Sequence, residues 1–229
     1  MAKSRHVINN KSASILNGTT FEEIKNIRNA IFQNNIVLLE AALIKVQDIN
    51  HLYGFYDSNL HLIDWTSGIS SMEDSTKMTL LHFAAKLGRA DCIQLLINHK
   101  SNPNIYSLRN TSMLAPLLTP LHELCCGLVD EKSNYAKAAE VLLKNGADLN
   151  ASVYNNTLRK TAYELCFDIE TPEEKKIEES ESLRRSSYRL MVPVTLPDFL
   201  RTKSADLIKE VFTNYKNIQN KDTEFKLNV

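Results

Sequence analysis

The sequence predicts an all-α fold, an α-solenoid of about four divergent repeats joined by elongated loops. The first observation is a motif that begins at Thr79 (TLLHFAA) and returns in related form at Thr119 (TPLHELC) and Thr161 (TAYELC). The second is that each of the first two copies is followed by an apolar run and then by a polar turn ending in Asn104 or Asn150. A unit of about 33 residues with two short helices is typical of stacked repeats.

Residues 21–50 predict a degenerate first repeat. Thr20 can cap a helix, and the two glutamates that follow suit the positive end of the helix dipole. Isoleucines then recur every three to four residues, which indicates one buried face. A second helix is expected over 37–43, after which Asp48 to Asn50 repeats the polar closing turn. A terminal repeat is expected to be atypical because one of its faces meets water.

The later repeats differ from the second in their insertions. In the second repeat Asn104 follows Thr79 by 25 positions, whereas in the third Asn150 follows Thr119 by 31. We therefore place an insertion at 127–135, between the two helices of the third repeat. The fourth repeat is expected to be split, with helices over 161–168 and 203–215 and a charged insert between them.

The motifs resemble the ankyrin repeat, clearly over residues 72–168 and in outline over 21–215. The resemblance implies that the motif threonine caps the first helix and that His82 and His122 bond to the turn backbone and bridge repeats. It also implies that Gly146 ends a second helix in a left-handed turn. Ankyrin arrays usually bind other macromolecules, so the resemblance implies a non-enzymatic protein-interaction module.

The chain departs from the ankyrin pattern at several of these positions. Glu164 replaces the motif histidine in the third copy, which suits an end repeat with fewer neighbours. Lys100 and Val46 stand where Gly146 stands in its own repeat. We therefore expect these two helix ends to be strained or differently shaped.

The predicted organisation has three parts. A flexible N-terminal tail precedes an ankyrin-repeat domain with elongated fingers, the loops between repeats, and a C-terminal tail follows it. The boundaries are 1–20 for the first tail, 21–215 for the domain and 216–229 for the last tail, with repeats near 21–54, 72–107, 113–153 and 158–215 and insertions at 55–75, 127–135 and 169–202.

Composition narrows the function classes. The formal net charge is zero, so nothing favours nucleic acid or an anionic membrane as a partner. No apolar run is long enough for membrane insertion, and the polar N-terminus shows no classical signal peptide. The four cysteines fall within predicted helices and are expected to be reduced thiols. We expect a cytoplasmic monomer whose partner is another protein.

Lysine outnumbers arginine 18 to 9, and asparagine and isoleucine are abundant, which hints at an AT-rich genome. With its irregular insertions, the chain resembles ankyrin proteins that intracellular bacteria deliver as effectors into the host-cell cytoplasm. Cytosolic adaptor proteins of AT-rich eukaryotes look alike at this level, so both origins stay open.

The repeat motif accounts for the residues that could form a catalytic or metal site. His122 with Cys125 and Cys126 could suggest a thiol nucleophile and its base, but no third group orients them. Zinc binding by these residues with His82 lacks a paired C-x-x-C spacing. No glycine cluster could cradle a phosphate. We predict no catalytic residue, no metal and no cofactor.

The binding surface is expected on the fingers and on the concave face. The only tryptophan, Trp65, lies in a finger that the repeat does not require, so it either packs inward or anchors a partner. Phe83 and Glu123 occupy the variable first-helix position that faces the groove in ankyrin proteins. The predicted protein-binding residues are Trp65, Tyr53, Phe55, Tyr56, Phe83, Tyr106, Arg109, Met113, Glu123 and Tyr154.

Two alternatives depend on the insert at 169–202. An enzyme, or an inhibitor of one, could use this charged insert as its working part. A phosphorylation-regulated cytosolic scaffold could be modified at Ser186 or Ser187, since the preceding arginine pair matches a basophilic kinase site.

Overall fold

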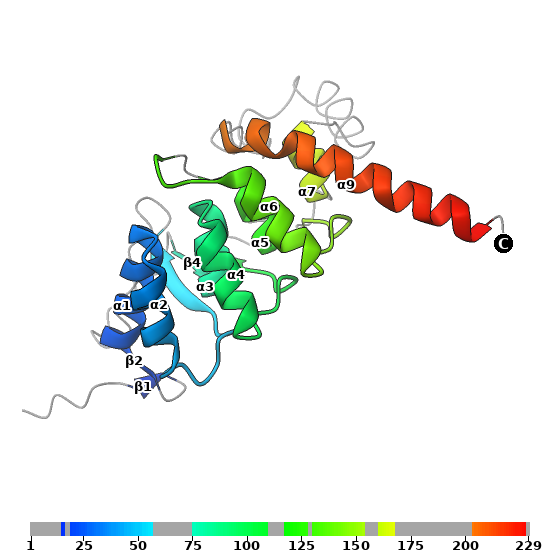
Figure 1. The fold of residues 1–229 in the computed structure, drawn as a ribbon. Helices are drawn as coiled ribbons and strands as arrows, with labels where there is room; N and C mark the ends of the chain where they lie inside the picture. The colour runs from blue at the N-terminus through cyan, green and yellow to red at the C-terminus, as the bar shows by residue number, and fades with distance from the viewer. Residues whose placement is uncertain are drawn as a thin grey trace, which may run out of the picture.

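Consecutive helix pairs stack in one direction and build the body of the molecule (Figure 1). The computed structural model describes residues 15–16, 19–56, 75–109, 117–127, 130–153, 160–167 and 203–227. In these segments the first helices of the pairs are α1 (Phe21–Gln33), α3 (Leu80–Lys86), α5 (Pro120–Cys125) and α7 (Ala162–Phe167). The second helices are α2 (Ile36–Leu43), α4 (Ala90–Asn98), α6 (Tyr135–Lys144) and α9 (Lys203–Leu227).

The helices form two rows. In the first row α1 packs on α3, α3 on α5 and α5 on α7; in the second, α2 packs on α4, α4 on α6 and α6 on α9. Buried leucine, isoleucine and alanine side chains from both rows make one continuous core. Because each repeat buries its apolar faces against its neighbours, the core extends along the stack. The predicted all-α solenoid is confirmed.

Threonines cap the first helices as the motif predicts. The hydroxyl of Thr20 accepts a hydrogen bond from Glu23 N–H at 3.3 Å, and the Glu23 carboxylate accepts one from Thr20 N–H at 2.9 Å. Thr161 and Glu164 make the same reciprocal pair, at 3.2 Å and 2.8 Å. Each pair satisfies two backbone N–H groups that a helix start leaves without partners. Glu164 therefore replaces the motif histidine in capping.

The closing turns of neighbouring repeats are hydrogen-bonded to one another. The Asn50 side chain accepts from Asn102 N–H at 2.7 Å and donates to Lys100 O at 3.3 Å. Asn104 makes the corresponding pair of contacts one repeat further along, at 2.9 Å and 2.8 Å. The prediction that Asp48 to Asn50 is a repeat-closing turn is confirmed by this shared geometry.

The ends of the second helices differ as expected. Gly146 has a φ of 87°, the left-handed conformation that glycine adopts without steric cost. Lys100 has a φ of 72° at the matching position, where a side chain is strained. At Val46 the chain takes another course, since α2 ends at Leu43 and its capping residue, Ile44, has a right-handed φ of −56°. Lys100 is thus the strained end and Val46 the differently shaped one.

The segment between α5 and α6 binds back on the preceding repeat. Tyr135, buried at the start of α6, donates its hydroxyl hydrogen to Lys86 O at 2.8 Å. Asn134 N–H donates to Gly88 O at 2.8 Å. This segment therefore joins the second and third repeats.

Both ends of the described chain contain more regular structure than expected. Strands β1 (Ile15–Leu16) and β2 (Thr19–Thr20) pair where only a flexible tail was expected. Helix α9 continues to Leu227 instead of ending near Tyr215. No glycine or proline occurs in α9, so nothing in its sequence breaks the helix. None of the described helices combines the length and the apolar character that a membrane span requires.

Candidate protein interface

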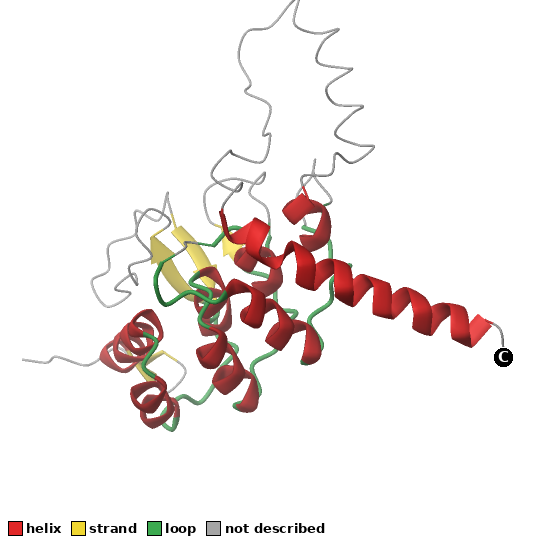
Figure 2. Ribbon diagram, turned by 45° about the horizontal axis from the view of Figure 1, so that its top comes forward, coloured by secondary structure: helices red, strands yellow, loops and turns green. Residues whose placement is uncertain are grey.

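Two fingers of the solenoid join in one antiparallel sheet. Strands β3 (Tyr53–Tyr56) and β4 (Ser75–Met78) belong to the first finger, and β5 (Leu108–Arg109) belongs to the second. β4 lies between the other two strands and pairs with both. Figure 2 shows these strands together at one side of the helices. Segments from separate insertions therefore form one surface, which a partner could contact as a unit.

The third finger is connected to the second by a side chain. The hydroxyl of Tyr106 donates to Ser152 O at 3.1 Å. Ser152 itself forms a bridge with Thr161 across the third finger. Tyr106 is partly buried, and burial raises the pKa of its hydroxyl. The predicted residue Tyr106 thus holds two fingers together.

Two aromatic residues of β3, Tyr53 and Phe55, pack inward. Tyr53 is 1% exposed and Phe55 is fully buried. The Phe55 ring stacks on the ring of Phe83 from α3, with 5.2 Å between centroids. Burial raises the pKa of Tyr53 to about 12. The sheet is therefore fastened to the first row of helices by the rings that were predicted to contact a partner.

The expectation that Phe83 and Glu123 face an open groove is wrong, because both are fully buried. The β3 side of the finger sheet covers Phe83. The Glu123 carboxylate lies 3.2 Å from the Lys86 ammonium group, whose side chain is 11% exposed. A carboxylate removed from water needs such a partner. These two variable positions stabilise the stack instead of lining a groove.

Other predicted interface residues are placed only in part. Tyr56 pairs with Ser75 at the end of the first hairpin, and Arg109 pairs with Thr76. Trp65, Met113, Tyr154, Ser186 and Ser187 lie outside the described residues, as does the insert at 169–202. Whether any of these residues contacts a partner stays a prediction.

Leu108 is a surface residue that sequence reasoning missed. It is 44% exposed, while its neighbour Ser107 is fully buried. It pairs with Lys77 of β4. The alternation of an inward and an outward residue is the usual signal of a half-buried strand, but a two-residue strand is too short for that signal to be seen.

The motif histidines bridge repeats. Nε2 of His82 lies 3.0 Å from Leu118 O, and Nε2 of His122 lies 3.3 Å from Lys160 O. A carbonyl only accepts, so each Nε2 carries the hydrogen and each Nδ1 accepts from the N–H of the capping threonine, at 3.3 Å. Burial lowers the pKa of both histidines to about 4. Both rings are therefore neutral structural groups at neutral pH.

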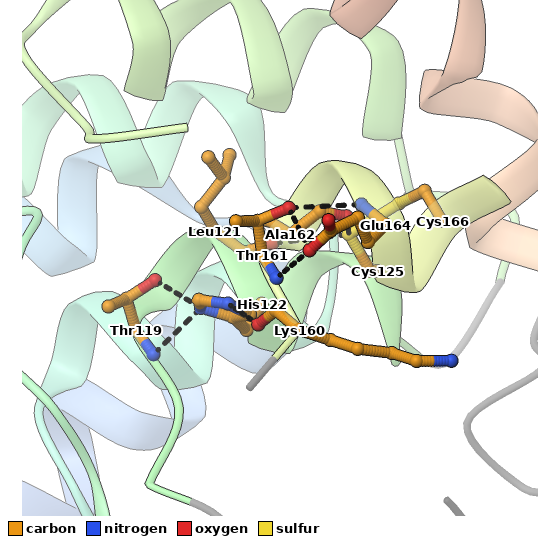
Figure 3. The surroundings of a disulfide bond; sticks show 9 residues. All are labelled: Thr119, Leu121, His122, Cys125, Lys160, Thr161, Ala162, Glu164 and Cys166. Carbon is orange, nitrogen blue, oxygen red and sulfur yellow. Dashed lines mark hydrogen bonds between the residues drawn. A yellow bond between two sulfur atoms is a disulfide. The ribbon is translucent and has the colours of Figure 1, made fainter. Parts of the chain in front are cut away.

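A disulfide joins Cys125 of α5 to Cys166 of α7, with 5.8 Å between their Cα atoms (Figure 3). The expectation of four reduced thiols is wrong for this pair. The stacking of first helices brings the two cysteines within bonding range, which spacing along the chain could not reveal. Cys92 and Cys126 are buried, and burial raises the pKa of Cys92 to about 12.

The chemistry available to His122 and its neighbouring cysteines is limited. The imidazole is committed to Thr119 and Lys160 backbone groups, and Cys125 is held in the disulfide. In the part of the chain that the structure describes, no group of three or more histidine, cysteine or acidic residues could hold a metal ion.

The family comparison agrees with this geometry. Residues 43–153 match the model for ankyrin repeats (3 copies). The comparison with curated proteins gives no match. Ankyrin repeats generally mediate protein–protein interaction and are typically non-catalytic. From the capped first helices, the histidine bridges, the bonded closing turns and this match, the chain is an ankyrin-repeat protein.

Proposed function

We propose that the protein binds a partner protein through the finger sheet, which is formed by β3, β4 and β5, and through the loops that extend from it. The observation that supports this is the pairing of Thr76 and Lys77 with Arg109 and Leu108, which unites two insertions in one sheet. Repeat proteins need no such sheet for stacking, and loops held on a rigid scaffold are where binding residues concentrate.

The finger sheet offers a packed base from which the fingers extend. Its inner ring, Phe55, stacks on Phe83 of α3 and so fixes the sheet to the solenoid. Its first hairpin continues into a segment that contains Trp65, and tryptophan is enriched among the residues that dominate binding energy. Rigid support lowers the entropy lost when a partner binds.

We further propose that the chain is an effector that acts in the cytoplasm of a host cell. The excess of lysine over arginine, 18 to 9, and the irregular insertions support this origin. In a reducing cytosol the Cys125–Cys166 disulfide would open, so the solenoid must hold its fold there through stacking alone.

The finger sheet can be tested with a variant that shortens the first hairpin. Tyr56 and Ser75 are paired in register, so residues 57–74 can be replaced by an Asn-Gly turn. The intact chain and this variant are used to capture proteins from host-cell lysate, with Lys144→Ala on exposed α6 as a control. We expect the variant to keep its melting temperature and to lose the captured partner. Equal capture by both chains would contradict the proposed surface.

A further inference from the structure

Helix α2 carries an apolar stripe on the side that faces away from the core. Val37 is 76% exposed, Leu38 53% and Ile44 79%. With the exposed Ala41 they recur along α2 at the spacing of one helical face. The opposite face holds the buried Leu39 and Leu43. Glu40 is the one polar residue in α2, and a helix that is apolar on nearly every side is normally covered by neighbours.

The other second helices are polar at the positions that match Val37. Counting back nine residues from Val46, Lys100 and Gly146 gives Val37 in α2, Asp91 in α4 and Lys137 in α6. Asp91 and Lys137 form an ion pair of 2.7 Å across the two repeats. The row of charges thus stops at α2, where an aliphatic side chain takes its place.

Ile44 also stands where the other second helices carry a polar residue. It matches Asn98 of α4 and Lys144 of α6. Both of these residues are exposed. The aliphatic residues of α2 therefore do not reflect what the repeat requires at these positions.

Leu38 shows which way the stripe faces. It matches Cys92 and Ala138, which are fully buried by the preceding repeat. The Cys92 thiol, for example, lies 3.4 Å from the side-chain oxygen of Asn34 in the repeat before it. The surface at Leu38 is therefore the stacking face that α4 presents to α2 and that α6 presents to α4. In α2 this stacking face is exposed.

We propose that α2 binds an amphipathic helix of a partner protein, which packs beside it as a preceding second helix would. The established stacking of α4 on α2 and of α6 on α4 supplies the geometry. Because Val37 replaces a charge, the docked helix presents an apolar residue there. This surface lies on the second row of helices and is distinct from the finger sheet.

The small size of the stripe argues for a partner helix over a second copy of the chain. α2 has eight residues, which at about 1.5 Å per residue gives two turns. A symmetric contact of two such helices falls far below the roughly 800 Å² per partner of a stable complex. A transient contact with one helix suits such an area, and helices bind in this way through anchors three and four residues apart.

The test uses a model helix as the probe. A peptide of about 18 residues carries leucines on one face, and a peptide of the same composition with the leucines dispersed serves as its control. Amide chemical shifts of the full chain are followed during titration. We expect shifts centred on Val37, Leu38, Ala41 and Ile44 with the amphipathic peptide only. Equal binding of the dispersed peptide, or shifts confined to other helices, would overturn the proposal.

Matched variants locate the contact. Val37→Asp with Ile44→Asn introduces the residues that α4 carries at the same positions, so the fold is expected to tolerate them. We expect about tenfold weaker peptide binding, whereas Asp91→Ala with Asn98→Ala in α4 should leave it unchanged. Leu38→Ala provides a milder variant if the first pair lowers the melting temperature. Unchanged affinity in both α2 variants would refute the site.

Two further outcomes separate this surface from its alternatives. Sedimentation velocity of the intact chain tests whether a second copy binds the stripe. If the intact chain self-associates and the variant Val37→Asp with Ile44→Asn does not, the stripe is a dimer contact. That result would overturn the proposal of a partner helix. The hairpin variant that lacks 57–74 should bind the peptide as the intact chain does. Loss of peptide binding in that variant would place the contact at the finger sheet instead.

Discussion

Arg89 and Asp130, 41 residues apart, form a two-pronged ion pair that joins two repeats. The Arg89 guanidinium donates to both carboxylate oxygens, at 2.6 Å and 2.5 Å, and also to Phe32 O at 3.0 Å. Arg89 is 1% exposed, whereas the Asp130 side chain is 43% exposed. One side chain thus connects the end of α1, the start of α4 and the insertion before α6.

Asp130→Ala should lower the free energy of unfolding by about 1–3 kcal/mol, because it leaves a buried guanidinium without its carboxylate. Lys132→Ala, beside it and exposed, is the control and should change stability by less than about 0.5 kcal/mol. Urea denaturation measures both. A loss no larger than that of the control would show that Arg89 is adequately solvated without Asp130.

Acid should weaken the solenoid through His82 and His122. Burial lowers the pKa of both to about 4, against an ordinary value near 6.5, so the unfolded chain binds more protons between these values. Stability is therefore full above pH 6.5 and falls toward pH 4, by up to about 1.4 kcal/mol per pH unit for each histidine. Urea denaturation at pH 7 and pH 5 measures the change.

A variant isolates the histidine contribution. His122→Ala should cost about 1–3 kcal/mol at pH 7, because the buried Thr119 N–H loses its acceptor and Lys160 O keeps only the hydrogen bond from Val153 N–H. It should also reduce the loss of stability between pH 7 and pH 5. The same pH dependence in the intact chain and in the variant would mean that carboxylates, and not this histidine, govern acid sensitivity.

Substitutions at the matching helix ends, Lys100 and Gly146, should change the stability of the fold in opposite directions. Lys100→Gly removes a side chain from a φ of 72° and should raise stability by about 0.5–1 kcal/mol. Gly146→Ala should lower it by about 1 kcal/mol through backbone strain alone, since an added Cβ would meet no atom within 4 Å. Thermal melts compare them. Effects of the same sign would contradict the left-handed assignment at one of the two ends.

The disulfide should stabilise the last repeats without being required for the fold. Cys125 and Cys166 are 41 residues apart, and closing a loop of that length contributes about 4 kcal/mol through the unfolded chain. Cys125→Ala with Cys166→Ala, or a reducing agent on the intact chain, should lower the melting temperature. Cys92→Ala, which leaves the bond intact, controls for the loss of a buried thiol. If a reducing agent lowers the melting temperature of the intact chain no more than it lowers that of the double variant, the bond does not form in solution.

The sequence predicted the features that recur from one repeat to the next. Asp48 to Asn50 and Lys100 could be placed because each occupies a position that another repeat also shows, and stacking imposes the same geometry on every copy. Contacts between distant segments could not be predicted in this way. The Cys125–Cys166 bond depends on how α5 lies against α7, which no local pattern records.

The candidate interface was the part predicted least well. Phe83 and Glu123 hold the motif's variable position, which suggests a surface residue, yet a finger sheet and the Lys86 side chain cover them. A finger outside the repeat pattern covers Phe83, and a lysine of the neighbouring repeat covers Glu123. Leu108, on the same sheet, is exposed but lies in a strand of two residues, where alternation is not visible.

The central claim is that a partner protein binds the finger sheet. Hydrogen–deuterium exchange of the full chain, with and without the partner captured from lysate, measures this most directly. The account predicts slower exchange on binding at 53–56, 75–78 and 105–109, with no change at 137–144 on α6. Protection confined to the second row of helices, with the finger sheet unchanged, would contradict it.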